Sequence, residues 1–125
     1  MTNSDARLIV LKMLDKTISN KGFSNIILDS ELSKAPLSDR DKRFCSALYY
    51  GVIERMLTLD FIIGNYSSKK LNKLDTGVVN ILRMGLYQLI YMDSVPDSAA
   101  INECVGLTRK IKLSSASGFV NAVLR

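Results

Sequence analysis

The chain has 125 residues, 47% of them apolar, which is the size and composition of one globular domain. Its 17 Lys and Arg residues outnumber its 12 Asp and Glu residues, and the net charge of +5 either suits an anionic partner such as nucleic acid or simply keeps a small domain soluble. With no histidine and only two well-separated cysteines, Cys45 and Cys104, the sequence offers no histidine base, redox pair or metal-ligand cluster, so we expect no bound metal.

The amino terminus and the hydropathy pattern predict neither export nor membrane insertion. Residues 1–5 are polar, and the stretch after them carries Arg7 and Lys12, whereas a signal peptide has an uninterrupted apolar core. No apolar window reaches the length of about 18 residues that would suggest a membrane-spanning helix. We therefore expect a cytoplasmic protein without membrane contact.

Apolar residues at spacings of three and four predict a series of amphipathic helices. The first is capped by Asn3 or Ser4 and carries its apolar stripe as far as Ile18. The second, over residues 26–32, ends before Pro36, because proline disfavours helical backbone in the residue ahead of it.

The third predicted helix is the most apolar of the series. It begins at Ser38 or Asp39, and its apolar positions continue to Ile63, with no charge at all over residues 44–53. A helix that is apolar on nearly every face usually lies in the middle of its bundle. We therefore expect this helix to form the centre of the core.

Three further helices are predicted beyond a polar joint at residues 67–70. The first is capped by Asp75 or Thr76 and runs to about Met92, and the second is capped by Asp97 or Ser98. The third spans residues 118–125, and because the chain stops inside it we interpret the sequence as a truncated piece of a longer protein. No strand pattern persists, so the fold class is an all-α bundle of six or seven helices around a central apolar helix.

Three glycines fall inside predicted helices, namely Gly51, Gly85 and Gly106. A glycine in a helix interior costs about 1 kcal/mol relative to alanine. We interpret each of them as a position where a neighbouring helix approaches closely.

The carboxyl-terminal part of the chain contains several motifs that occur together in one known family. They are ILRMGLYQL at residues 81–89, Val95-Pro96, AAINE at residues 99–103 and GFVNAVLR at residues 118–125. Together they resemble the signature of the NusB family, and Asp39-Arg40, Tyr50-Gly51-Val52 and Arg55 fit the same family. The resemblance covers most of residues 38–125 and implies a NusB-like helical bundle, while the first 37 residues match by pattern only.

Within this family the sequence is more similar to the domain that precedes the catalytic part of Sun-type (RsmB) ribosomal RNA methyltransferases. The similar features are Tyr50-Gly51 ahead of Arg55, the pair Ala99-Ala100 and the ending Asn121 to Arg125. The resemblance implies that residues 1–125 are one RNA-binding domain truncated before a C-terminal methyltransferase domain. Its partners would be ribosomal RNA and that catalytic domain.

The chemistry implied by the resemblance lies outside this chain. The parent enzyme would transfer a methyl group from S-adenosylmethionine to carbon 5 of a cytosine in small-subunit ribosomal RNA, so S-adenosylmethionine is expected only in the missing domain. Cys45 and Cys104 lie in apolar helical patterns, unlike an activated nucleophile, and we interpret both as core residues. We predict no catalytic residue and no cofactor site in this chain.

Two other functions fit the same sequence. A free-standing NusB-type transcription antitermination factor would bind a leader RNA and a small ribosomal protein, and it would act as an adaptor. A purely structural domain would hold its parent protein together through helix contacts and would never touch nucleic acid.

Two groups of basic residues are the candidate RNA contacts, because neutralising phosphates supplies much of the affinity for nucleic acid. One group lies at the start of the third predicted helix, where Asp39 and Asp41 also fit an ordinary solvated surface. The other lies on the joint near residue 70, where Tyr66 is the best candidate for stacking on an unpaired base. The predicted RNA-binding residues are Arg40, Lys42 and Arg43 in the first group, Tyr66, Lys69, Lys70 and Lys73 in the second, and Arg83 one helix further on.

Overall fold

The computed structural model describes residues 3–20, 24–34 and 36–125, which within these ranges form seven α-helices, two short 3-10 turns and no strand. The prediction of an all-α bundle is therefore confirmed. The elements are α1 (Asn3–Asn20), α2 (Ser24–Lys34), α3 (Asp39–Glu54), α4 (Met56–Tyr66), η1 (Leu71–Lys73), α5 (Thr76–Tyr91), α6 (Asp97–Lys110), η2 (Ser114–Ala116) and α7 (Ser117–Leu124).

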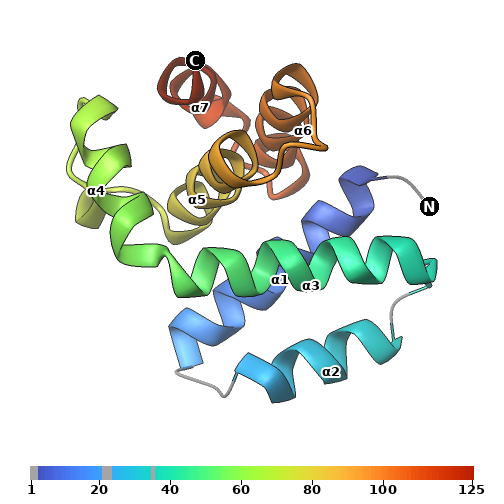
Figure 1. Cartoon of the computed structure of the whole chain (residues 1–125). Coiled ribbons are helices and arrows are strands. Elements are labelled where there is room, and N and C mark those ends of the chain that lie inside the picture. Colours follow the sequence, from blue (N-terminus) through green and yellow to red (C-terminus); the bar gives the residue numbers. More distant parts are fainter. Residues whose placement is uncertain (1–2, 21–23, 35) are drawn as a thin grey trace.

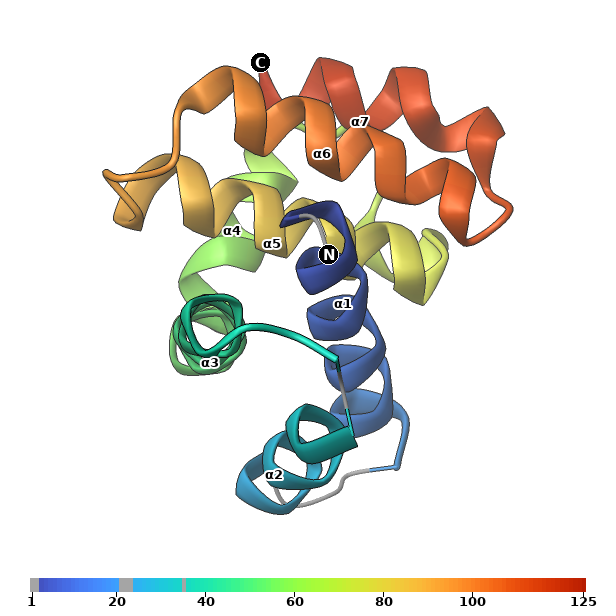
Figure 2. The ribbon, with the colours of Figure 1, turned by 90° about the vertical axis from the view of Figure 1, so that its right-hand side faces the viewer.

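Helix α5 lies at the centre of the bundle. It packs against α1, α3, α4, α6 and α7, and Figures 1 and 2 show α6 and α7 on one side of it and α3 on the other. Its sequence carries one charge, Arg83, in sixteen residues, and most of its side chains from Val78 to Met84 are buried. The bundle does surround an apolar helix, but we had expected the helix over residues 39–63 in that place, and that identification is wrong.

The long helix predicted over residues 39–63 is broken in two at Arg55. Arg55 leaves helical geometry, with φ −113° and ψ 18°, although its backbone N–H still donates to the Gly51 carbonyl at 3.1 Å. Figure 1 shows that α4 then runs in a different direction from α3. The change of direction lets both helices pack against α5, which one straight helix of this length would not do.

The interpretation of the helix glycines is confirmed at two positions and wrong at the third. A Cβ atom on Gly51 would lie 2.0 Å from Cζ of Tyr87, and one on Gly85 would lie 2.6 Å from Cδ1 of Leu124. Nothing lies within 4 Å of a Cβ atom built on Gly106, so no close approach explains that glycine.

Two of the predicted helix caps are present. The Ser38 hydroxyl accepts from the backbone N–H of Asp41 at 3.1 Å, and the Asp75 carboxylate accepts from that of Gly77 at 2.8 Å. The expected cap of α6 is wrong, because Pro96 occupies the N-cap position and no side chain bonds there. The expected cap at Asn3 or Ser4 depends on side chains outside those the structure describes.

Candidate nucleic-acid interface

The two predicted basic groups lie at opposite ends of the molecule. Arg40 and Arg43 are exposed at the start of α3 and Lys42 is half-buried there, whereas the lysines at 69–73 surround η1 beyond the end of α4. Figure 1 shows the start of α3 and the end of α4 on opposite sides of the view. The structure therefore does not join the two groups into one basic surface.

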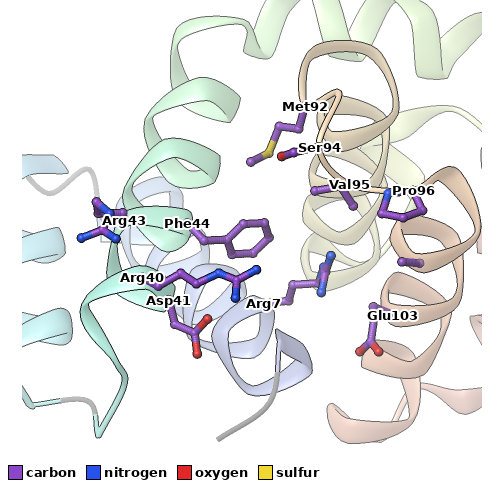
Figure 3. Close-up of a pocket in the computed structure, with 11 residues that line it drawn as sticks. Arg7, Arg40, Asp41, Arg43, Phe44, Met92, Ser94, Val95, Pro96 and Glu103 are labelled. Atoms are coloured by element: carbon purple, nitrogen blue, oxygen red, sulfur yellow. The ribbon is translucent and has the colours of Figure 1, made fainter.

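The first group borders a pocket of about 410 Å³ between α1, α3 and the α5–α6 connection (Figure 3). Arg40 and Arg43 line this pocket together with Arg7 from α1. The carboxylates of Asp41 and Glu103 also line it, so the five charged side chains leave one net positive charge. We call this site the arginine pocket.

Arg7 is the buried member of the arginine pocket, with 2% of its surface exposed. Its Nε donates to Oε1 of Gln88 at 2.8 Å, and its guanidinium carbon lies 5.0 Å from the centre of the Phe44 ring. Burial lowers the pKa of Arg7 from its ordinary value, an effect opposed mainly by Cys104 and Glu103, but an arginine side chain stays charged in a protein. The pocket thus contains a permanent, largely desolvated positive charge.

No described carboxylate forms an ion pair with Arg7. The ion pairs among the described residues are Lys16 with Glu31 and Arg83 with Asp60. Buried charges are normally paired, because removing a charge from water is costly. Arg7 instead depends on a neutral amide and an aromatic ring, and this leaves it able to attract an anion.

Gln88 fixes the position of Arg7 from the central helix. The Gln88 side chain is fully buried, and its Nε2 donates to the Met84 carbonyl at 2.9 Å and to Sγ of Cys104 at 3.7 Å. With its amide held in this way, Oε1 is presented to Arg7. The orientation of the guanidinium is therefore set by α5 before any ligand arrives.

Arginine side chains and apolar side chains lie on different sides of the pocket, which the carboxylates of Asp41 and Glu103 also line. Figure 3 shows the Arg40 guanidinium extending toward Arg7 and Phe44, while Arg43 points away to the other side. Met92, Val95 and Pro96 of the α5–α6 connection lie opposite. Such a site can take an anionic group and a flat apolar group at the same time.

A second cationic and aromatic pair lies at the other end of α3. The Arg55 guanidinium carbon is 4.3 Å from the centre of the Tyr91 ring, and that ring is 5.1 Å from the Tyr87 ring. Arg55 and Tyr91 are both exposed. The family resemblance had drawn attention to Arg55, but no pattern in the sequence indicated its contact with Tyr91.

The lysines around η1 form an open basic surface. Lys69 and Lys73 line a shallow depression of about 270 Å³ beside residues 113–119, and Nζ of Lys69 lies 5.9 Å from the Phe119 ring centre. Lys70 is exposed, and Tyr66 has 72% of its surface exposed at the end of α4. These side chains are accessible to a ligand, but no buried charge accompanies them in the described part of the chain.

Arg83, which we had predicted as an RNA contact, is bonded within the protein. Its Nε and Nη2 donate to the two carboxylate oxygens of Asp60 at 2.7 and 2.9 Å, and its Nη1 donates to Asn80 at 2.8 Å. Its side chain is 12% exposed. This arrangement ties α5 to α4, and we leave Arg83 out of the proposed RNA site.

The interpretation of both cysteines as core residues is confirmed. Cys45 and Cys104 are buried and unpaired, and burial raises the pKa of each thiol to about 12. A nucleophilic cysteine needs a lowered pKa. The described residues also contain no group of three or more Cys, Asp or Glu side chains arranged to hold a metal ion.

A search of the described helices finds none that combines the length and the apolar character needed to cross a membrane.

Comparisons with known proteins relate the chain to two groups of relatives. The model of the NusB family matches residues 4–125. Over 96% of its length the chain is 38% identical to a Synechocystis sp. protein named "Probable ribosomal RNA small subunit methyltransferase B", of which it covers 27%. Over 95% of its length it is 29% identical to the transcription antitermination protein NusB of Ruminiclostridium cellulolyticum, of which it covers 83%.

The fold also matches a solved structure. The antitermination factor structure that contains NusB and NusE in complex with dsRNA aligns with a TM-score of 0.87, covering 99% of this chain and 95% of that one at 20% identity. At this identity the likeness establishes the fold alone. The chain spans about a quarter of the length of the methyltransferases that it matches.

Proposed function

This chain belongs to the NusB family, and from that premise we propose that it is a non-catalytic RNA-binding domain that positions small-subunit ribosomal RNA for methylation. The methylation itself, at carbon 5 of a cytosine and dependent on S-adenosylmethionine, would be carried out by a C-terminal catalytic domain outside these 125 residues. In this proposal the partners are ribosomal RNA and that catalytic domain.

The observation that carries the proposal is the buried positive charge of Arg7 beside Arg40. Arginine guanidinium groups bind phosphate oxygens through short, charge-assisted hydrogen bonds. Arg7 lacks a carboxylate partner among the described side chains, and it lines the arginine pocket. A phosphate of the RNA backbone supplies the missing negative charge.

The relatives support a ribosomal RNA methyltransferase as the parent protein. The 38% identity extends over almost the whole chain but only a quarter of the methyltransferase, as expected for one domain of a larger enzyme. The high thiol pKa of both cysteines agrees with chemistry performed elsewhere.

The second candidate is a free-standing antitermination factor that binds a leader RNA and a small ribosomal protein. It is favoured by the match to the antitermination protein from R. cellulolyticum, because the chain covers 83% of that relative. The dsRNA in the complex of NusB with NusE supports RNA binding by this fold under either candidate.

A methylation assay separates the two candidates. A full-length protein containing this domain, incubated with small-subunit ribosomal RNA and labelled S-adenosylmethionine, should incorporate methyl groups, and deleting residues 1–125 should reduce incorporation. The isolated domain should bind fragments of the same RNA with an affinity that falls as salt rises. Unchanged methylation after deletion, together with no salt-dependent RNA binding, would refute the proposal.

A further inference from the structure

We propose that the outer face of α4 is the surface on which this domain docks the catalytic domain of its own parent protein. This inference rests on the proposed function and goes beyond it, because it assigns the contact between the two domains to named residues.

The outer face of α4 is apolar, and no described part of the chain covers it. Leu57 and Phe61 lie one helical turn apart, with 87% and 71% of their surfaces exposed. Gly64 lies one turn further on, and nothing is within 4 Å of a Cβ atom built on it. We call these three residues the α4 face.

The α4 face also carries no charge. The one charged residue of α4 is Asp60, and its carboxylate is turned inward to accept from Arg83 of α5. A helix on the surface of a monomer normally directs charged and polar residues outward, and an exposed apolar surface normally marks an interaction site. The α4 face therefore has the character of an interface.

The exposed apolar residues of the molecule gather around this face. Six large apolar side chains are exposed in the described part of the chain, and only Ile26 of α2 lies far from α4. The end of α5 lies beside the start of α4, because Arg55 contacts the Tyr91 ring. The other five lie on α4 or in the last turn of α5, and they are Leu57, Phe61, Tyr66, Ile90 and Tyr91.

The surroundings of the α4 face favour a protein partner over RNA. Binding to nucleic acid depends on cations that neutralise phosphates, and the α4 face has none. Glu54, Arg55 and Asn65 are exposed at its edges. An apolar centre with a polar rim is the usual composition of a contact between proteins.

The carboxyl-terminal end of the chain lies close to the same helix. Leu124 of α7 approaches α5 at Gly85, and Asp60 of α4 bonds to α5 at Arg83, only two residues away. Because packed helix axes are 8–10 Å apart, α7 ends within about 20 Å of the axis of α4. Figures 1 and 2 show α4 and this end of the chain away from α2.

This position favours the parent's own catalytic domain over a second copy of the chain. About six extended residues span 20 Å, so a short linker after Arg125 would bring the next domain to the α4 face. A short linker gives an effective concentration in the millimolar range, at which a small apolar face suffices for docking, whereas two free copies would pay the full cost of association. The chain covers only 27% of its Synechocystis sp. relative, so in the proposed function most of the parent is available as the partner.

Photocrosslinking within the full-length parent protein tests the contact directly. Phe61 is replaced by the photoreactive amino acid p-benzoylphenylalanine, the protein is irradiated, and the crosslinked peptides are identified by mass spectrometry. The matched control carries the same group in place of Ile26, which is 61% exposed on α2. We expect position 61 to crosslink to the catalytic domain of the same molecule and position 26 to give no such crosslink.

The double variant Leu57→Gln/Phe61→Gln of the full-length protein tests what the contact does. Both side chains are exposed within this domain, so its fold should not change. Loss of an anchor residue weakens an interface about tenfold or more, so methylation of small-subunit ribosomal RNA should fall at least about tenfold. RNA affinity, measured by fluorescence anisotropy with a fluorescein-labelled fragment, should stay the same. Leu57→Met/Phe61→Leu keeps the face apolar and Ile26→Gln leaves it untouched, so both should methylate like the unaltered protein.

Three results would overturn the inference while leaving the proposed function intact. They are crosslinks from position 61 that join only two separate protein molecules, as expected for a second copy, the absence of any crosslink to the catalytic domain, and equal methylation by the double variant and Ile26→Gln. A full-length protein that neither binds nor methylates the RNA would refute the proposed function, and this inference with it.

Discussion

The guanidinium carbon of Arg7 lies 5.0 Å from the centre of the Phe44 ring, and this contact joins α1 to α3 at the floor of the arginine pocket. A desolvated contact of this kind stabilises a cation by about 2 kcal/mol. The ring thus offsets part of the cost of burying the charge without neutralising it. Stability and the proposed anion binding at this site therefore both depend on Arg7.

Arg7→Met should destabilise the protein, because the buried Oε1 of Gln88 then loses its donor. An unsatisfied buried acceptor costs about 1–3 kcal/mol. The double variant Arg7→Met/Gln88→Leu removes both partners and should recover most of that loss in urea unfolding. If the double variant were no more stable than Arg7→Met alone, the two side chains would not act as a pair.

Gly51→Ala and Gly106→Ala should have opposite effects on stability. The new methyl group at position 51 meets the Tyr87 ring and should cost about 1–3 kcal/mol, the usual penalty of overpacking. At position 106 the space is open, and the gain in helix propensity should stabilise by up to about 1 kcal/mol. Thermal unfolding of both variants measures the difference, and a tolerated Gly51→Ala would contradict the close approach of α3 and α5.

Arg83→Gln should affect stability but leave RNA binding unchanged. The substitution breaks the bidentate contact with Asp60 and should lower the free energy of unfolding by about 1–3 kcal/mol. The loss is smaller than for a fully buried pair because Asp60 is 26% exposed. Arg40→Gln makes the same chemical change at an exposed site. It should weaken RNA binding and leave stability unchanged. Anisotropy and urea unfolding of both variants are the measurements. A loss of RNA affinity in folded Arg83→Gln would restore Arg83 to the binding site.

Cys45 and Cys104 should be unreactive in the native protein. A thiol with a pKa of about 12 is a thiolate in only about one molecule in ten thousand at pH 8, and only the thiolate reacts with a disulfide reagent. Because burial disfavours the charged form, reactivity should increase as the pH rises toward that value. Both thiols should react at once in denaturant, and fast modification of the folded protein would contradict their burial.

The helices were predictable from the sequence, but their arrangement was only partly so. Spacings of three and four locate the helical segments, because they place apolar residues on one face of a helix, but they gave no sign of the break at Arg55 that separates α3 from α4. The centre of the bundle was misjudged because the uncharged run at residues 44–53 looked more apolar than α5, which contains Arg83. Asp60 neutralises that arginine from α4, and a contact over such a distance in sequence leaves no local pattern.

The sequence predicted only some of the residues of the arginine pocket. Arg40 and Arg43 were identified from charge, whereas Arg7 was treated as an ordinary polar residue of an amphipathic helix. A signal was present, because Arg7 falls on the same helical stripe as the buried residues Val10, Leu11 and Leu14. A charged residue on an apolar stripe requires a partner, and that requirement identifies it as a site candidate.

The salt dependence of RNA binding tests the central claim most directly. The affinity for a single-stranded fragment of small-subunit ribosomal RNA is measured over a range of salt for the unaltered protein, Arg40→Gln and Arg109→Gln, the last an exposed arginine at the end of α6 away from the pocket. Each phosphate contact on a single strand contributes about 0.7 to the slope of log affinity against log salt. We expect Arg40→Gln to weaken binding and to lower the slope by about that amount, with Arg109→Gln unchanged. Equal slopes for all three proteins would show that the arginine pocket does not bind the RNA.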